Sequence, residues 1–368
     1  MEAQLDRGLG RRKFLGAAAS LAATHAALGR DYMTAGYEPK LFPGSIVDVS
    51  GIRVGHFTDL RRPTGCTVVL FDRGAVAGVD VRGSAPGTRE TDLLNPINTV
   101  QQVNAIVLAG GSAYGLDAAT GVMQYLEEHG SGYRVGRHVV PIVPAAILFD
   151  LSIGDGKIRP DRQSGYAACR AASGSDVPQG NVGAGAGATV GKFFGSKNAM
   201  KSGLGTASVQ AGTELVVGAI VAVNAGGDVL DCRAPHRILA GARASDGHAF
   251  RNSMQEILQG ALLGGKEAQA GGHTTIGIVA TNAALSKAES AKIAQMAQDG
   301  LARVINPVHT AADGDTVFAA GTGQSHIRAD VTTIGAVAAE VMARAINNAV
   351  LAATGIPGYP ACRDLLKR

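Results

Sequence analysis

The sequence predicts an α/β protein of the α+β type, in which layers of helix cover layers of sheet. The expected strands come in runs and the expected helices in separate blocks, unlike the alternation of a parallel βαβ fold. Apolar residues make up 46% of the 368 residues, 51 residues are glycine and Trp is absent. This composition indicates a large core of closely packed small side chains in one large unit or two ordinary domains.

The first half of the chain is expected to be mainly strand. Residues 45–57 have the pattern of a short strand pair with a turn at Ser50-Gly51. The other elements expected here are strands at 67–71, 77–81 and 104–109, helices at 116–128 and 164–172, a proline-punctuated apolar segment at 139–151 and a glycine-alanine loop at 181–191.

The second half is expected to hold longer strands and helices. In order, the pattern predicts strands at 206–210 and 214–224, a turn at Gly226-Gly227, a strand at 275–281, a helix at 287–305, a turn at Asp313-Gly314-Asp315, a strand at 316–320 and a helix at 334–353. The glycine-rich residues 260–272 are the best candidate for an exposed, cleavable linker.

The N-terminus resembles a twin-arginine export signal. Arg11-Arg12 precede Phe14-Leu15 and an alanine-rich run too short to span a bilayer. Gly10 is a small departure, because Ser or Thr is usual there. We therefore expect residues 1–30 to be a removed signal peptide and the mature protein to be periplasmic or secreted. The alternative is a disordered basic tail on a cytoplasmic protein.

Charge and composition argue against several partners. The formal net charge is +4, and no basic stripe carries interleaved aromatic residues, so nucleic-acid binding is not expected. No other segment has the pattern of a membrane span, so no stable membrane insertion is expected. Cys66, Cys169, Cys232 and Cys362 lack metal-type spacing. These cysteines could form disulfides or be buried free thiols, and the sequence does not decide between the two. Neither a metal nor an organic cofactor is expected.

The glycine-rich run at 183–193 superficially resembles a nucleotide-binding loop. It fails the P-loop spacing because Ala186 stands at the first glycine position and Phe193 stands where Ser or Thr would bind magnesium. A dinucleotide fingerprint also requires a βαβ setting that the sequence does not predict.

The most informative segment is Gly271-Gly272-His273-Thr274, which leads into an apolar strand. The Thr274 hydroxyl could attack the preceding carbonyl, so that the chain breaks after His273 and Thr274 gains a free amine. An α-amino group has an ordinary pKa of about 7.7–8.0, so it could act as general base for its own hydroxyl. By itself the segment also fits an ordinary strand that contains two threonines.

Several segments together resemble the peptidase family that includes L-aminopeptidase/D-amidase-esterase, β-peptidyl aminopeptidases and the nylon-oligomer hydrolases. They are the segments at 48–56, 83–90, 110–116, 185–192, 223–228 and 274–282, in the family's order. The resemblance implies an αββα four-layer sandwich of the N-terminal-nucleophile hydrolase kind. It also implies one autocleavage, into fragments 31–273 and 274–368 that stay together as one catalytic domain, and a homo-oligomer of such two-fragment protomers.

The resemblance also assigns roles to five residues. Thr274 matches the nucleophile, and Asp313 and Asp315 match two acidic residues that hydrogen-bond the nucleophile in the nylon hydrolases. Asn224 matches an oxyanion-side asparagine. Lys192 matches a lysine near the nucleophile that would keep its amine neutral and stabilise negative charge. Without the resemblance, the Asp-Gly-Asp turn would pass as an ordinary turn.

Two departures bear on rate and substrate. His273 precedes the nucleophile where the nylon enzymes have Asn, which affects the rate of cleavage rather than its possibility. Ile147 and Phe149 stand where the aminopeptidases carry a glutamate, which binds the free amine of the substrate, and a tyrosine. An amidase or endo-type hydrolase of small peptides or linear amides is therefore expected, with Phe149, Tyr114 and Ser112 as candidate pocket residues.

Two other functions compete with this interpretation. An ornithine-acetyltransferase-like acyl transferase uses a similar threonine autocleavage, but the matching segments belong to the peptidase branch and an export signal fits a cytosolic transferase poorly. A non-cleaving binding protein of the same fold would give a single band on a denaturing gel, where the hydrolase would give two.

Overall fold

The computed structural model describes residues 39–366 except 248, 264–271, 326 and 328–329. The expected signal peptide at 1–30 lies outside the described residues, as does most of the expected linker at 260–272.

Within the described residues, nine strands form one large mixed sheet. The order is β10-β11-β14-β16-β2-β4-β7-β3, with β1 paired to β2 beside this path. Only the pairs β14–β16 and β4–β7 are parallel. The bounds are β1 Ile52–Asp59, β2 Thr64–Val81, β3 Thr88–Arg89, β4 Gln102–Ala109, β7 Ala145–Ile147, β10 Leu204–Ala211, β11 Leu215–Asn224, β14 Thr274–Thr281 and β16 Thr316–Gly321.

Smaller strands and the helices complete the fold. The remaining strands are β5 Tyr133–Val135, β6 His138–Val140, β8 Thr189–Val190, β9 Met200–Lys201, β12 Asp228–Asp231, β13 Ala234–Ala240 and β15 Ile305–Asn306. The α-helices are α2 Ala118–Glu128, α3 Arg162–Arg170, α4 Ser253–Leu258, α5 Lys287–Val304, α6 Val331–Ala352 and α7 Cys362–Leu366. Short 3₁₀ turns are η1 Ile46–Asp48, η2 Asp92–Leu94, η3 Ser112–Asp117, η4 Gly183–Gly185 and η5 Ser196–Asn198.

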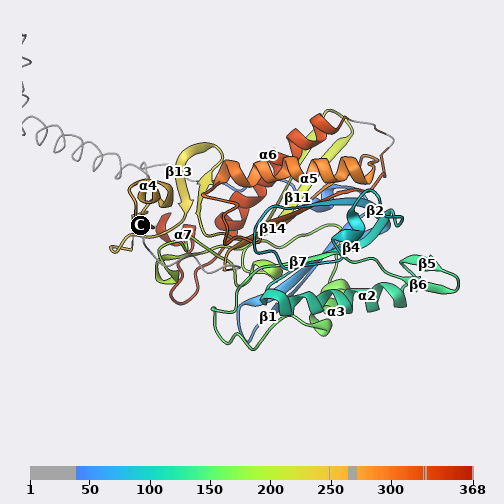
Figure 1. Cartoon of the computed structure of the whole chain (residues 1–368), viewed down its shortest axis with the longest axis horizontal. Coiled ribbons are helices and arrows are strands. Elements are labelled where there is room, and N and C mark those ends of the chain that lie inside the picture. The colour runs from blue at the N-terminus through green and yellow to red at the C-terminus, as the bar shows by residue number, and fades with distance from the viewer. Residues whose placement is uncertain (1–38, 248, 264–271, 326, 328–329, 367–368) are drawn as a thin grey trace, which may run out of the picture. The chain divides into compact units, whose positions relative to one another are not determined.

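The long strand β2 joins the two halves of the sheet. Its first part pairs with β1, and its last part pairs with β16. The register with β4 shifts between Leu70 and Ala75, an irregularity that bends a strand locally. Helices α5 and α6 cover the half that contains β11 and β14, whereas α2 and α3 cover the half that contains β1 and β4 (Figure 1).

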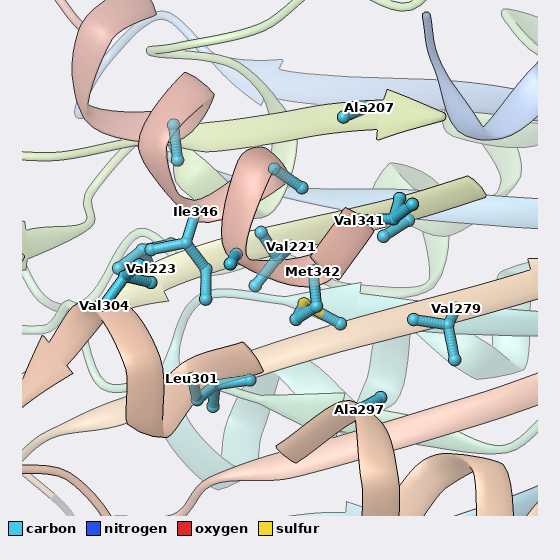
Figure 2. Packing of buried hydrophobic residues seen from close by; sticks show 14 of the residues in the cluster. Ala207, Val221, Val223, Val279, Ala297, Leu301, Val304, Val341, Met342 and Ile346 are labelled. Atoms are coloured by element: carbon cyan, nitrogen blue, oxygen red, sulfur yellow. The ribbon is translucent and has the colours of Figure 1, made fainter. Parts of the chain in front are cut away.

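Three separate cores show that the molecule has four layers. In β11, Val221 and Val223 pack with α5 and α6, as Figure 2 shows around Met342. The intervening Ile220 and Ala222 belong to a second core, between the two halves of the sheet. Because side chains alternate along a strand, each sheet half buries both of its faces.

The strand β2 shows the same alternation on the other side of the molecule. Val69 and Phe71 enter the core between the sheet halves, whereas Val68 and Leu70 enter a third core against α2 and α3. The order helix, sheet, sheet, helix confirms the expected αββα sandwich.

Local sequence explains how the two longest helices form and pack. Ser286 caps α5 in a reciprocal capping box with Glu289. Gly300 lets α5 approach α6 closely, since a Cβ there would lie 2.4 Å from the Ala339 carbonyl oxygen. Helix α6 has the length and hydropathy of a membrane span, but 72% of its most apolar window is buried, which is typical of a core helix.

Several expected elements need correction. The first expected strand of 45–57 is instead the 3₁₀ turn η1, because Ser45 and Asp48 cap each other. The strands expected at 67–71 and 77–81 are one continuous strand, and the start of the helix expected at 116–128 is 3₁₀. Helix α7 was not predicted. All four cysteines are free, and Cys232 alone among them is not fully buried.

Candidate active site

Thr274 is the first residue of β14 and is 2% exposed. It lies opposite Asn224, the last residue of β11, in the antiparallel register. His273, one residue earlier, forms a parallel bridge with Asp313 just before β16. The expected cleavage point therefore lies where β14 emerges between its two neighbouring strands, and four of the predicted site residues come from those strand ends or the loops beside them.

Two hydrogen-bond donors contact the carbonyl oxygen of the peptide bond between His273 and Thr274. The Thr274 hydroxyl donates a hydrogen bond to the His273 carbonyl oxygen, so it lies beside the group that it would attack. The Gly314 N–H donates to the same oxygen at 3.0 Å. A fixed N–H on the oxygen that gains negative charge is the arrangement of an oxyanion hole. Sequence reasoning missed this donor, although Gly314 separates the two predicted aspartates.

We expect Gly314→Ala to slow self-cleavage about 10-fold or more, since misplaced reacting groups and oxyanion donors are costly. A Cβ there would lie 2.6 Å from the Ala85 carbonyl oxygen and 2.9 Å from Thr274 Oγ1. Intact-mass spectra over time measure the rate. Gly174→Ala is the control, because its Cβ would meet only ordinary contacts at 3.6 Å or more. Equal rates for both variants would contradict the prediction.

Lys192 connects the cleavage segment to Asn224. Its Nζ donates to the Asn224 carbonyl and Oδ1, both at 2.8 Å, and to the Gly272 carbonyl at 3.1 Å. Burial lowers the pKa of Lys192 to about 7, against the opposing effect of the Asp313 and Asp150 charges. Three acceptors match the three N–H groups of an ammonium.

Asn224 is oriented by both ends of its side-chain amide. Its Oδ1 accepts from Lys192 and from the Thr189 N–H, and its Nδ2 donates to the Phe149 carbonyl at 2.9 Å. In the uncut chain the Asn224 amide therefore donates to the Phe149 carbonyl, and the Gly314 N–H donates to the His273 carbonyl. The expected role of Asn224 towards a substrate oxyanion stays a prediction.

The Asp315 side chain bonds the residue after Thr274, whereas the Asp313 side chain bonds its own loop. Asp315 Oδ1 accepts the Thr275 N–H at 2.7 Å, and Asp313 Oδ2 accepts the Thr310 N–H at 2.6 Å. Burial, followed by the negative charge of Asp315, raises the pKa of Asp313. In the uncut chain the Thr274 hydroxyl bonds the His273 carbonyl instead. The expected contact with the free Thr274 amine concerns the cut protein and stays a prediction.

The His273 side chain is enclosed beside the site. Its ring lies edge-on to Phe193, with the ring centroids 5.5 Å apart, and its Nδ1 is 3.9 Å from Asp313 Oδ1. Burial, together with the nearby Lys192 charge, lowers the pKa of His273 to about 3. The imidazole is therefore neutral near pH 7.

A buried ion pair fixes the segment that faces Asn224. Arg62 and Asp150 are both almost fully buried and bond each other. Asp150 also accepts from Thr64 Oγ1 at 2.7 Å and from the Gly111 N–H at 2.9 Å. Asp150 directly follows Phe149, so these bonds hold the carbonyl that orients Asn224.

A second lysine supports the glycine-alanine loop. Lys201 is fully buried, and its Nζ donates to the carbonyls of Gly185, at 3.0 Å, Ala188, at 3.1 Å, and Ser202. These hydrogen bonds fix the loop that carries Thr189 and leads to Lys192.

Lys201→Met is expected to destabilise the fold by about 2–4 kcal/mol, because three buried carbonyls each lose a charged donor, although those of Gly185 and Ala188 keep a backbone N–H. Urea unfolding of the variant and of the parent protein measures the difference. Lys197→Met, at an exposed position, is the control and should leave the midpoint unchanged. An unchanged midpoint for Lys201→Met would mean that these carbonyls are satisfied without the lysine.

The three candidate pocket residues differ in their relation to the site. Phe149 reaches it through its carbonyl. Ser112 adopts a left-handed φ of 55°, and its N–H donates to Leu148 in the neighbouring segment. Tyr114 is 62% exposed, with the Arg159 guanidinium 3.7 Å from its ring centroid. Their role in binding substrate stays a prediction. Across residues 39–366 with the stated gaps, no group of three or more His, Cys, Asp or Glu could hold a metal ion.

Known proteins resemble this chain along nearly all of its described length. The model of peptidase family S58 matches residues 44–362. An uncharacterised aminopeptidase of Mycobacterium leprae is 46% identical over 345 residues, 86% of this chain and 92% of the relative. The 6-aminohexanoate-oligomer endohydrolase of a Kocuria species is 31% identical over 311 residues, 80% of this chain and 82% of the relative.

Two solved structures share the fold. The β-aminopeptidase of a Burkholderia species superposes with a TM-score of 0.64 at 21% identity, covering 92% of this chain and 98% of that one. The L-aminopeptidase D-Ala-esterase/amidase of Ochrobactrum anthropi, described as a variant of the Ntn hydrolase fold, has a TM-score of 0.64 at 18% identity, covering 90% and 96%.

Proposed function

This chain belongs to peptidase family S58, and on that basis we propose that it cuts itself between His273 and Thr274 and then hydrolyses amide bonds with Thr274 as nucleophile. The observation that carries the proposal is the pair of hydrogen bonds on the His273 carbonyl oxygen, one from the Thr274 hydroxyl and one from the Gly314 N–H.

Self-cleavage begins with the Thr274 hydroxyl. Its oxygen attacks the His273 carbonyl carbon, and the Gly314 N–H stabilises the negative charge on the carbonyl oxygen. The bond between that carbon and the Thr274 nitrogen then breaks as the nitrogen takes up the proton lost by the hydroxyl, leaving an ester. Water hydrolyses the ester, so that His273 becomes a C-terminal carboxylate and Thr274 gains a free amine.

Substrate hydrolysis uses the new amine. It takes the proton from Thr274 Oγ1 as that oxygen attacks the substrate carbonyl, and it returns the proton to the leaving amine. Water then releases the acyl group. Asn224 and Lys192 stand on the oxyanion side in this mechanism, and Asp313 with Asp315 would hold the amine.

We propose small peptides or linear amides as substrates. Of the two relatives, one is named an uncharacterised aminopeptidase and the other a 6-aminohexanoate-oligomer endohydrolase. Ile147 and Phe149 offer no charged or hydroxyl group to a substrate amine, which favours amidase or endo-type cleavage over strict aminopeptidase action.

We also propose export through the twin-arginine pathway to the periplasm or beyond, on the basis of Arg11-Arg12 and the following apolar run. The protomer would consist of the fragments 31–273 and 274–368 and would assemble into a homo-oligomer.

Intact-mass analysis under denaturing conditions tests the central claim, together with N-terminal sequencing of any small fragment. A fragment that begins at Thr274 would support the nucleophile. A single chain that remains uncut on long incubation would refute self-cleavage and favour a binding protein of the same fold.

A further inference from the structure

His309 lies in the loop that leads to the Asp313–Asp315 turn, and no sequence motif singles it out. Its imidazole Nδ1 is 2.9 Å from Asp315 Oδ2, and its own backbone N–H points to the same oxygen at 3.3 Å. Since a carboxylate only accepts hydrogen bonds, Nδ1 carries the proton in this pair. Asp315 Oδ2 thus accepts two hydrogen bonds from His309.

The other oxygen of Asp315 holds the nucleophile's strand. Oδ1 accepts the Thr275 N–H at 2.7 Å, on the peptide that joins Thr275 to Thr274. The parallel register of β14 with β16 begins one residue later, at Ile276 and Thr316. The Asp315 side chain therefore bridges the interruption at Thr274 and Thr275 between this pairing and the backbone bridge of His273 with Asp313.

The His309 backbone adopts an uncommon conformation. Its φ of 55° lies in the left-handed region, which few residues other than glycine adopt, although Asn, Asp and His do so more often than the rest. Such strain persists where the surrounding structure imposes it, commonly at functional sites. The side chain is 16% exposed, and its Nε2 is buried without a hydrogen-bond partner among the described residues.

We propose that His309 is a positioning residue for the nucleophile. Its imidazole fixes the Asp315 carboxylate, and Asp315 in turn fixes the Thr274–Thr275 peptide, so that Thr274 Oγ1 stays beside the carbonyl that it attacks. The inference rests on the proposed function and adds a residue to it.

Two variants separate the imidazole from the strained backbone. An asparagine side chain tolerates the left-handed φ, and its Nδ2 can replace the Nδ1 donor, so His309→Asn should cleave itself within about 5-fold of the parent rate. His309→Gly relieves the strain but removes the donor. It should cleave about 10- to 100-fold more slowly, the effect of losing one hydrogen bond to a charged group.

Rescue by the asparagine is the readout that a purely structural role would not give, because His309→Asn restores the donor to Asp315 whereas His309→Gly does not. Unfolding of Thr274→Val/His309→Gly against Thr274→Val, both uncut, should show that the fold is retained.

Each outcome has a definite meaning. If the parent protein never cleaves, the proposed function fails. If the parent cleaves and His309→Gly cleaves at the same rate, only the role of His309 is overturned. It is also overturned if His309→Asn fails as badly as His309→Gly while remaining folded. His138→Ala, on the exposed β6 hairpin strand, is the histidine control and should match the parent.

Discussion

Thr274→Val is expected to stay a single uncut chain and to hydrolyse amides at least about 10⁴-fold more slowly than the parent, because removing a nucleophile eliminates the covalent pathway. Valine has nearly the shape of threonine and suits the start of β14, so the loss would reflect the hydroxyl rather than the fold. The uncut chain would also lack the free amine that serves as general base. Intact mass and an amide-hydrolysis assay measure the two losses.

Thr275→Val is the matched control. Thr275 is fully buried one residue further along, and its hydroxyl has no hydrogen-bond partner among the described residues. The same chemical change there should leave the cut in place. If Thr275→Val remained uncut while Thr274→Val was processed, the cleavage point would lie one residue later than proposed.

Lys192→Met is expected to slow self-cleavage by about 10²- to 10³-fold, a loss comparable to that of an oxyanion-hole donor. The variant removes the only side chain that bonds both the Gly272 carbonyl and Asn224 among the described residues. The Gly272 carbonyl then loses its donor one peptide before the reacting bond. Mass spectra over time measure the rate, with Lys197→Met as the exposed control.

The pH dependence of self-cleavage tests the charge state of Lys192. The precursor has no Thr274 amine, so that group cannot contribute. Three oxygens surround Nζ, and only the ammonium form can donate a hydrogen bond to each of them. We therefore expect the rate of self-cleavage to fall as the pH rises through about 7, the pKa of Lys192. This limb should be absent in Lys192→Met. A Lys192-dependent rate that rises through pH 7 would instead identify the neutral amine as the active form.

The free energy of unfolding should rise with pH where the self-cleavage rate falls, so the effect of Lys192 on the rate can be distinguished from its effect on stability. The pKa of Lys192 is about 7 in the folded chain, below its ordinary value of 10.5. Between these values the unfolded chain binds more protons, so the Lys192 contribution to the free energy of unfolding rises from about pH 7 to 10.5 and is constant below that window. A falling rate in this window therefore cannot come from unfolding at Lys192.

The sequence by itself determined the main elements and predicted the point of cleavage. Strands β11, β14 and β16 and helices α5 and α6 all lie within a few residues of their expected bounds. Their apolar patterns are long and regular, so local periodicity identifies them. The resemblance to the peptidase family, carried by short motifs in the family's order, led to Thr274, Asn224, Lys192 and the two aspartates.

The apolar pattern gave the wrong element at two places, residues 45–48 and the strand β2. The capping box of Ser45 and Asp48 makes a 3₁₀ turn from residues with strand propensity. The strand β2 continues through the break expected between residues 71 and 77, because both β4 and β16 pair with it. Pairing partners distant in sequence override weak local preferences.

Only the tertiary structure decided how the site is assembled. The donor on the His273 carbonyl is the backbone of Gly314, and a backbone N–H has no signature in the sequence. Lys192 bonds the carbonyl of Gly272, 80 residues away, and His309 contacts Asp315, which in turn bonds Thr275. Local sequence fixes which residues can form a strand or a turn, but these contacts depend on the register of β14 between β11 and β16, which the packing of the four layers sets.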